Sequence, residues 1–516
     1  MNARHPTDDL INSSDTSRLS TSGSVWTTDS SYIVETPTMR FDATPDASVD
    51  DQPVIGIIGM GEMGKMYAKT LSRAGWAKIN VCDRSENFAQ LREEMEGTPG
   101  IKVLRDGHAV SRTADWIMYA VEAQFIEKVV EEYGPSTKVG AIVGGQTSVK
   151  TPEREAFEKY LPEDVHIVSC HSLHGPTVSP EGQPLVIIRH RGPDWALQLV
   201  ENILRPFKSH FVYLSYEEHD LVTANTQAVT HAAFLSMGTA WHCSQSYPWE
   251  QGWYVRGIEV IKVNIMLRIY SNKWHVYAGL AILNPAARDM IGQYATSATE
   301  LFKLMLAGDS AGLRTRVYRA REALFGPHRR VTPILLSEDV LDRFSMSRGE
   351  PPNPNVDPTD GSAPRRAARP SISSTHPTNA NANTNSHLSL LAMVDCWAAL
   401  NIDPFAHLSL AATPLFRMWI GVAEYLFRSE TRLNAALDAA VHDVSHRSDD
   451  LEFVVAARGW SQCVTFGSFP LYKDRFKHTQ AFFKPRFAEA TALGSRMIQT
   501  ILDNAPPPTV EESEGS

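Results

Sequence analysis

Two hydrophobic patterns divide the chain near residue 215. Up to that point, short runs rich in β-branched residues alternate with stretches of helical periodicity. The runs are VIGIIG at 54–59, INVCD at 79–83, DWIMYAV at 115–121, VGAIVGG at 139–145, VHIVSC at 165–170 and PLVIIRH at 184–190. This alternation is typical of βαβ units and a mostly parallel sheet. From Tyr216 onwards, apolar residues recur every three or four positions and predict helices.

The helical part contains a short internal repeat. HAAFLSMGTAW begins at His231 and HLSLLAMVDCW begins at His387, and their His, Leu, Met and Trp residues coincide at a constant offset. Each copy is followed by a second apolar helical stretch, at 267–282 and at 414–427. We therefore expect two related helical units.

Polar segments separate these regions. The first fifty residues are rich in Ser, Thr, Asp and Pro, a composition that buries too little apolar surface to fold. A second polar stretch, which contains the Asn/Thr-rich THPTNANANTNS, reads as a flexible linker. The predicted organisation is a disordered tail at 1–50, an α/β domain at 51–215, helical unit 1 at 216–346, a disordered linker at 347–386, helical unit 2 at 387–504 and an acidic tail at 505–516.

Charge and composition exclude several classes of protein. The formal net charge is −10, which argues against a general nucleic-acid partner because such a partner requires a basic surface. Charged or polar residues interrupt every apolar run, so we expect no membrane span. The five cysteines show no CxxC spacing, so we expect neither disulfides nor a metal site. The first residues fit no targeting signal, and we expect a cytoplasmic protein.

The strongest chemical motif lies at the start of the α/β part. VIGIIGMGEMG sets Gly59, Gly61 and Gly64 in a GxGxxG pattern between a predicted strand and a predicted helix. The glycines permit a tight turn, close approach of a pyrophosphate and close packing of helix on strand. We therefore predict a Rossmann-type sheet in an α/β fold, followed by the all-α region. The predicted cofactor loop comprises Gly59, Met60, Gly61, Glu62, Met63 and Gly64.

The next strand ends in a carboxylate followed by a guanidinium. Asp83 lies where a carboxylate would hold the ribose 2′-hydroxyl of NAD. Arg84 follows it and can pair instead with the 2′-phosphate of NADP. The sequence leaves the choice of cofactor open but favours NADP over NAD.

Two polar segments follow later strands. QTSVK contains Ser148, and CHSLHGP contains His171. Ligands of open α/β sheets bind at the carboxyl ends of strands, so these two side chains are expected to meet beside the nicotinamide. A neutral histidine there can take a proton from a substrate hydroxyl while hydride leaves the same carbon. The alternative is a histidine that only caps the end of the strand.

At this point the motifs match a known family. GMGEMG, GGQTSVK, HSLHGP, EEHD and TQAVTHAAFLSMG, in this order, resemble the prephenate dehydrogenases, and the long form with a linker resembles their fungal NADP-dependent members. The resemblance covers roughly residues 53–503. It implies oxidative decarboxylation of prephenate to 4-hydroxyphenylpyruvate in tyrosine biosynthesis. It also implies a Rossmann domain followed by a dimer-forming helical domain; the internal repeat could replace a dimer, so a homodimer stays open.

The resemblance also implies roles for individual residues. His171 is similar to the family's catalytic histidine, although Ser172 stands where the family has proline. Ser148 is similar to the serine that orients this histidine and the substrate. The substrate-binding candidates are Lys150 beside that serine, and Gln227 and His231 in the helical part.

The arginine that grips a prephenate carboxylate is less well defined. The family's segment of small residue, Pro, hydrophobic residue, aromatic residue and Arg is matched at 413–417 and ends in Arg417, in helical unit 2. The corresponding place in unit 1 has Arg268 and Lys273 nearby. If the two units pack together as two bacterial subunits do, Arg417 reaches the site from within one chain.

Two rival functions remain. A β-hydroxyacid dehydrogenase also joins a GxGxMG loop to helices, but it uses a helical lysine in a glycine-rich motif that this sequence lacks. A regulator that senses NADP without turnover is the non-enzymatic alternative, and the Ser148 and His171 pair argues against it.

Overall fold

The computed structural model describes residues 41–176, 178–251, 253–254, 257–326, 336, 341, 385–411 and 413–503. Most of the predicted N-terminal tail and linker, and the acidic tail, lie outside the described residues. The predicted tail nevertheless ends too late. Ala43 is buried, and Gln52 Nε2 donates to the carbonyl oxygens of Pro45 and Ala47, so the segment from residue 41 is held against the sheet domain.

Eight strands form one sheet in the order β3-β2-β1-β4-β5-β6-β7-β8. All neighbours are parallel except β6 and β7, which confirms the mostly parallel sheet expected from the sequence. The strands are β1 (Ile55–Ile58), β2 (Ile79–Cys82), β3 (Ile101–Val103), β4 (Trp116–Tyr119), β5 (Ile142–Gly145), β6 (His166–Ser172), β7 (Pro184–Arg191) and β8 (His210–Tyr213).

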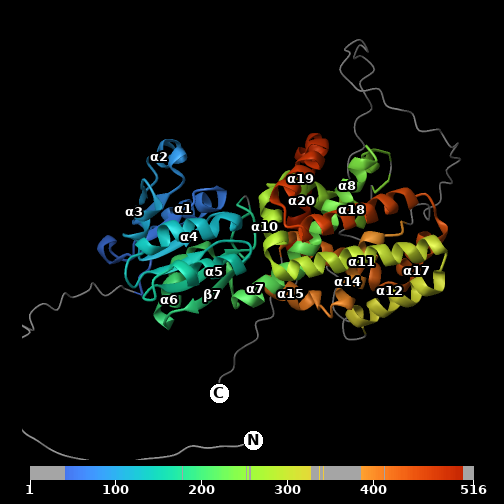
Figure 1. Cartoon of the computed structure of the whole chain (residues 1–516), viewed down its shortest axis with the longest axis horizontal. Coiled ribbons are helices and arrows are strands. Elements are labelled where there is room, and N and C mark those ends of the chain that lie inside the picture. The colour runs from blue at the N-terminus through green and yellow to red at the C-terminus, as the bar shows by residue number, and fades with distance from the viewer. Residues whose placement is uncertain are drawn as a thin grey trace, which may run out of the picture. The chain divides into compact units, whose positions relative to one another are not determined.

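Both faces of this sheet are covered (Figure 1). On one face, Ile117 of β4 and Val143 of β5 pack with Val130 and Phe157 from two helices. Trp116 and Met118 alternate with Ile117 along β4 and are also buried, as expected for a parallel sheet between helical layers. The helices are α1 (Glu62–Ala74), α2 (Phe88–Met95), α3 (Gly107–Ser111), α4 (Ile126–Tyr133), α5 (Thr151–Tyr160) and α6 (Asp194–Leu204).

The remainder of the described chain is helical. It begins with α7 (Tyr216–Thr223), a π-helical turn η6 (Ala224–Ala228) and α8 (Val229–Cys243). The later helices are α9 (Ile258–Ser271), α10 (Trp274–Leu283), α11 (Pro285–Ala307), α12 (Ser310–Phe325), α14 (Leu388–Ala399), α15 (Pro404–Ala411), α16 (Pro414–Phe427), α17 (Glu430–His442), α18 (Arg447–Thr465), α19 (Phe469–Phe483) and α20 (Phe487–Asp503). None of the helices described is long and apolar enough to span a membrane.

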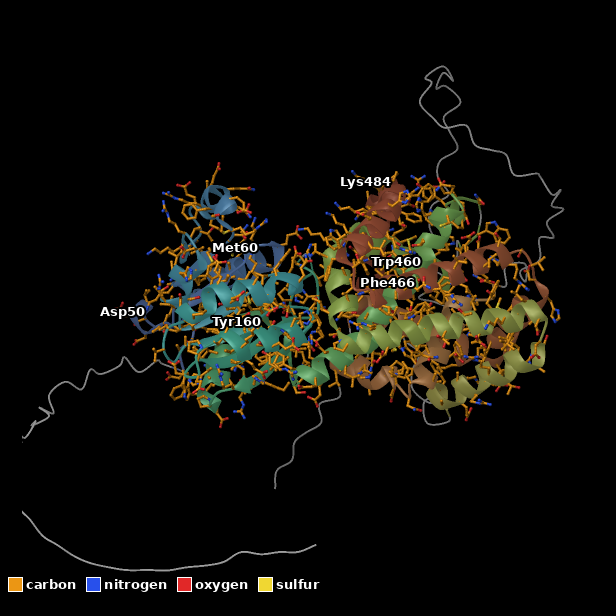
Figure 2. All side chains as sticks on the ribbon, viewed as in Figure 1. Asp50, Met60, Tyr160, Trp460, Phe466 and Lys484 are labelled. Atoms are coloured by element: carbon orange, nitrogen blue, oxygen red, sulfur yellow. The ribbon has the colours of Figure 1, made fainter. Side chains whose placement is uncertain are left out.

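The two predicted helical units share one hydrophobic core. A single cluster of buried side chains runs from Ala224 to Met497. Phe234 of α8 meets Trp419 of α16 edge to face, with ring centroids 4.8 Å apart. The indole nitrogen of Trp460, labelled in Figure 2, donates to Thr239 Oγ1 of α8 at 2.9 Å. The repeat aligns imperfectly, because His231 lies inside α8 whereas His387 precedes α14 in the left-handed region at φ 50°.

Candidate active site

The glycine turn between β1 and α1 leaves room for an anion. Gly59 has φ +101°, and a Cβ on Gly64 would lie 2.1 Å from the carbonyl oxygen of Gly59, so both positions require glycine. A Cβ on Gly61 would meet nothing within 4 Å. Gly61 is also the N-cap of α1 and provides no side-chain cap for the backbone N–H groups of the first turn. These N–H groups and the open space fit a dinucleotide pyrophosphate.

The end of β2 presents the two predicted ribose-recognition residues. Asp83 is half-buried, and its Oδ1 accepts the backbone N–H of Arg84 at 2.8 Å. The Arg84 side chain is 74% exposed and lies 3.3 Å from Glu86 Oε1. An exposed ion pair of this kind contributes little, so the guanidinium can exchange Glu86 for a phosphate at small cost.

His171 lies at the carboxyl end of β6 and is buried. Its Nδ1 is 2.7 Å from Nε2 of His219 on α7, and His219 Nδ1 is 3.0 Å from Asp220 Oδ1. Burial lowers the pKa of His171 well below its usual value, and the nearby His219, Lys150 and His174 lower it further. His171 is therefore a neutral imidazole able to accept a proton.

Asp220 is held by donors on several sides. It accepts the backbone N–H groups of Lys150 at 2.7 Å and Thr151 at 2.8 Å, and the Thr151 hydroxyl at 2.7 Å. Burial alone would raise the pKa of Asp220, but the hydrogen bonds from His219, Thr151 and Lys150 outweigh it and lower that pKa. Asp220 is therefore a carboxylate that only accepts hydrogen bonds.

Lys150 does not occupy the predicted substrate-binding position. Its side chain is fully buried, and Nζ donates to the carbonyl oxygens of Gly145 at 2.8 Å and Cys170 at 3.0 Å and to both oxygens of Glu153 at 2.9 Å. These partners use all the protons of an ammonium group. The structure thus contradicts direct substrate contact by Lys150 and shows a cation that ties the end of β5 to β6.

Ser148 does not hold His171 in the described structure. The serine is half-buried, and no hydrogen bond joins it to His171, whose Nδ1 faces His219. Ser172, which replaces the family's proline, has a partner of its own: its Oγ is 2.6 Å from the hydroxyl of Tyr67 on α1. That hydroxyl also donates to Gln146 Oε1 at 2.9 Å. The residue after His171 is therefore tied to the helix that begins at the glycine turn.

The helical part contributes buried polar atoms without partners. The π turn η6 carries Gln227, and α8 carries His231 one turn later. Gln227 Nε2 and His231 Nδ1 are buried and make no hydrogen bond in the described structure. Burial lowers the pKa of His231 to about 3, and its ring meets Tyr277 edge to face at 4.6 Å. Such atoms are costly unless a ligand satisfies them, and π turns often mark functional sites.

The three predicted cationic anchors lie in different surroundings. Arg268 on α9 has a buried Nη1 with no hydrogen-bond partner, and burial lowers its pKa. Arg417 on α16 is half-buried, and burial lowers its pKa too. Lys273 instead pairs with Glu62 of the glycine turn, with Nζ 2.9 Å from Oε1 and both side chains more than half exposed. The structure therefore brings Lys273 to the predicted cofactor loop.

Sequence reasoning missed His219 and Asp220. Both belong to EEHD, which in the sequence stands only as part of the family resemblance. Ser215 caps α7 in a capping box with Glu218, and this fixes where the two residues point. Two adjacent ionisable residues on the inner face of a short helix were the available signal.

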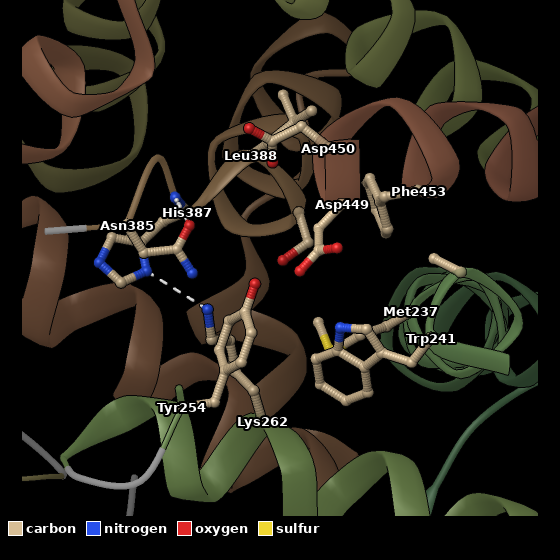
Figure 3. Close-up of a pocket in the computed structure, with 12 residues that line it drawn as sticks. Met237, Trp241, Tyr254, Lys262, Asn385, His387, Leu388, Asp449, Asp450 and Phe453 are labelled. Carbon is tan, nitrogen blue, oxygen red and sulfur yellow. Dashed lines mark hydrogen bonds between the residues drawn. The ribbon is translucent and has the colours of Figure 1, made fainter. Parts of the chain in front are cut away.

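A cavity of about 40 Å³ lies elsewhere, among α8, α9, α14 and α18 (Figure 3). Buried ionisable groups line it beside an apolar wall that contains Trp241 and Phe453. Lys262 Nζ lies 2.7 Å from Glu259 and 3.3 Å from Nδ1 of His387. The lining contains none of the predicted site residues, so this cluster is separate from the active-site candidates.

Comparisons with known proteins agree with these observations. Residues 228–503 match a family model of the 6-phosphogluconate dehydrogenase C-terminal domain, and residues 54–143 match NADP oxidoreductase coenzyme F420-dependent. A Schizosaccharomyces pombe protein named probable prephenate dehydrogenase [NADP(+)] is 52% identical, over 87% of this chain and 98% of that protein.

Two further relatives have related names. The prephenate dehydrogenase [NADP(+)] of Saccharomyces cerevisiae is 50% identical, over 88% of this chain and 94% of that protein. Among solved structures, the prephenate dehydrogenase from Aquifex aeolicus is 19% identical with a TM-score of 0.41, and the match covers 51% of this chain and 95% of that chain.

Proposed function

Because the chain belongs to the family of NADP-dependent prephenate dehydrogenases, we propose that it converts prephenate to 4-hydroxyphenylpyruvate with release of CO₂ and reduction of NADP⁺, a step of tyrosine biosynthesis. The observation that carries this function is the identity of half of all aligned residues over nearly the full length of both fungal relatives. The described site supplies what the reaction requires: a turn open to a dinucleotide and a buried neutral histidine tied to the same helix.

We assign cofactor binding to the glycine turn and the end of β2. The first-turn N–H groups of α1 would hold the pyrophosphate, and Arg84 would pair with the 2′-phosphate while Asp83 faces the ribose. Bound NADP⁺ supplies the hydride acceptor. The ion pair between Glu62 and Lys273 lies at the same turn and adds a contact from the helical part.

We assign proton transfer to His171. Its neutral ring takes the proton of the substrate hydroxyl as hydride leaves the carbon that bears this hydroxyl. The ring carboxylate then leaves as CO₂, and the electrons of the broken bond complete the aromatic ring. We place Ser148 on the substrate side of the histidine, since His219 already holds the other side.

Prephenate carries two carboxylates, and a chain of net charge −10 must provide local cations for them. Arg268 and Arg417 are the candidates, because neither guanidinium has a hydrogen bond or ion pair recorded in the described structure and both are largely removed from water. Gln227 and His231 add neutral polar groups that need partners. We therefore place the substrate between the end of β6 and the α8–α9 face.

The protein is expected to act on a free small molecule in the cytoplasm. Its five cysteines are all free in the structure, four of them buried, which suits a reducing compartment. Fractionation of cells that produce the tagged chain would test this placement, and recovery in an organelle would contradict it.

The function is tested by mixing the purified full chain with prephenate and following the absorbance of the reduced cofactor, with NADP⁺ and NAD⁺ in parallel. We expect turnover with preference for NADP⁺. His171→Asn should lower kcat by about 10²–10⁴-fold and leave the Kd of NADP⁺ unchanged. Binding of NADP⁺ without turnover would favour the regulator, and oxidation of a β-hydroxyacid in place of prephenate would favour the other rival.

A further inference from the structure

We propose that His219 and Asp220 are positioning residues that fix His171 in the tautomer whose Nε2 carries the lone pair. The three side chains form one continuous chain of contacts, from His171 Nδ1 to His219 Nε2 at 2.7 Å and from His219 Nδ1 to Asp220 Oδ1 at 3.0 Å. The inference rests on the proposed function, because it names the atom that receives the substrate proton.

The direction of the chain is set at Asp220. A carboxylate has no proton to give, and this one already accepts the backbone N–H groups of Lys150 and Thr151. Nδ1 of His219 must therefore carry the proton and donate it to Oδ1. A lone pair on that nitrogen would face the carboxylate across 3.0 Å with no hydrogen between them.

The second link follows from the first. A neutral imidazole carries one proton, so Nε2 of His219 is an acceptor. Nδ1 of His171 must then donate to it at 2.7 Å, since two lone pairs cannot face each other at that distance. The proton of neutral His171 is thus on Nδ1, and Nε2 is left as its basic atom. Asp220 acts on the reaction only through His219 and His171.

The surroundings keep this chain rigid. His219 is completely buried, and Asp220 is nearly so. The α7 helix that carries both is capped by Ser215 and Glu218, and Asn284 Nδ2 donates to the backbone carbonyl of Asp220 at 2.7 Å. When Nε2 of His171 accepts the substrate proton, the imidazolium donates through His219 towards a fixed carboxylate. The positive charge is therefore stabilised without a further proton acceptor.

The first experiment reads the tautomer directly in the wild-type chain. The full-length protein is labelled with ¹⁵N-histidine, and the imidazole signals of His171 are identified by their absence in His171→Asn. At neutral pH we expect a protonated Nδ1 and an Nε2 of the lone-pair type. A protonated Nε2 with a bare Nδ1 would overturn the proposal, whatever the enzyme's activity.

The second experiment compares two substitutions at one position. His219→Phe removes the acceptor, whereas His219→Gln keeps an amide oxygen that can take the place of Nε2. We expect His219→Phe to lower kcat by about 10²–10⁴-fold, the range for loss of the correct tautomer in a catalytic triad, with the Kd of NADP⁺ unchanged. His219→Gln should restore kcat to within about tenfold of the wild type, because one retained hydrogen bond accounts for most of the loss.

His166→Gln, on the same strand but outside the chain of contacts, is the matched control and should turn over normally. Equal losses in His219→Gln and His219→Phe, or no loss in either, would refute the positioning role. If His219→Phe fails to fold, the tautomer measurement decides alone. If the wild type does not oxidise prephenate while the tautomer is as stated, the proposed function fails and the positioning of His171 stands.

Discussion

Lys150 and Glu153 form a fully buried ion pair at the edge of the sheet where the site lies. Lys150→Met leaves the Glu153 carboxylate without its cation, which for a buried pair costs about 3–5 kcal/mol of unfolding free energy. Lys150→Met combined with Glu153→Met removes both charges and should recover most of that loss. Urea denaturation of the three chains measures the cycle. If Lys150→Met instead unfolds like the wild type and raises the KM for prephenate, the lysine contacts substrate as the sequence suggested.

Arg268 and Arg316 are two arginines with opposite surroundings. Arg268 Nη1 is buried without a partner, whereas Arg316 on α12 makes paired hydrogen bonds of 2.8 Å to both oxygens of Asp395 on α14. A charged hydrogen bond to a ligand is worth about 1.5–3 kcal/mol, so Arg268→Met should raise the KM for prephenate about 10–100-fold. It should not lower the Tm, because an unpaired buried charge is removed.

Arg316→Met is the matched control for that measurement. It should lower the Tm, because it leaves Asp395 unpaired, and leave the KM unchanged. The same pair of measurements on Arg417→Met tests the second candidate anchor. A fall in Tm with unchanged KM for Arg268→Met would make that arginine structural.

At the scale of an element, the turn from β1 into α1 separates two glycines by their neighbours. A Cβ on Gly64 would lie 2.1 Å from a backbone oxygen, whereas a Cβ on Gly61 would meet no protein atom within 4 Å. Gly64→Ala should therefore lower the Tm by several degrees, consistent with overpacking of about 1–3 kcal/mol. Gly61→Ala should fold normally and raise the Kd of NADP⁺ at least tenfold, because its methyl group occupies the space of the pyrophosphate.

Thermal unfolding and fluorescence titration with NADP⁺ measure both glycine variants. A Gly61→Ala chain that binds NADP⁺ as tightly as the wild type would remove this turn from the cofactor site. The comparison is informative because both substitutions add the same methyl group within one turn of chain.

Elements with strong local patterns could be predicted from the sequence. Six strands, the glycine turn and the helical nature of the second half follow from runs of buried residues with a clear period. Strands β3 and β8 escaped notice because they are short and partly exposed: Lys102 and Tyr213 point into solvent, so no apolar run marks them. Nothing in the run at 184–190 distinguishes an antiparallel strand from a parallel one.

The site was predictable only where a motif sits at a strand end. His171 and the glycine turn lie where the pattern indicated. The His219 and Asp220 chain requires a helix to be folded back onto the ends of β5 and β6, a long-range arrangement that local periodicity does not encode. Lys150 was misassigned because its buried partner Glu153 lies one helical turn away and looks like an ordinary surface pair in sequence.

At the scale of the whole molecule, one core joins segments on both sides of the predicted linker. The cluster near the cavity in Figure 3 shows how closely: Ser386, which the sequence assigned to the linker, is buried and donates to both oxygens of Asp450 on α18 at 3.0 Å. Lys262 of α9 and His387 meet beside it. The end of the predicted linker is therefore part of the fold, and the helical region is expected to unfold as one unit.

Asp450 makes the stability of this core depend on pH. Burial raises the pKa of Asp450 to about 7, and the neighbouring Asp449 raises it, while Ser386, Arg447 and Lys262 lower it. In the unfolded chain the carboxyl titrates near its ordinary value of about 3.9. Between these two values the folded chain keeps a proton that the unfolded chain releases, so the contribution of Asp450 to stability falls as pH rises through about 4 to 7 and is constant above.

Asp450→Asn removes this titration and keeps an oxygen that can accept the Ser386 hydroxyl. We expect the variant to be as stable as the wild type near pH 4 and more stable at pH 8, by about 1–3 kcal/mol, the scale of a shift of one to two pKa units. Buried His387 and His446 have lowered pKa values and oppose this trend below neutral pH, but both chains share them, so the difference isolates Asp450. Urea unfolding from pH 4 to pH 8 measures this difference. An Asp450→Asn chain that becomes progressively less stable than the wild type as pH rises would show that Lys262 holds the ionised carboxylate.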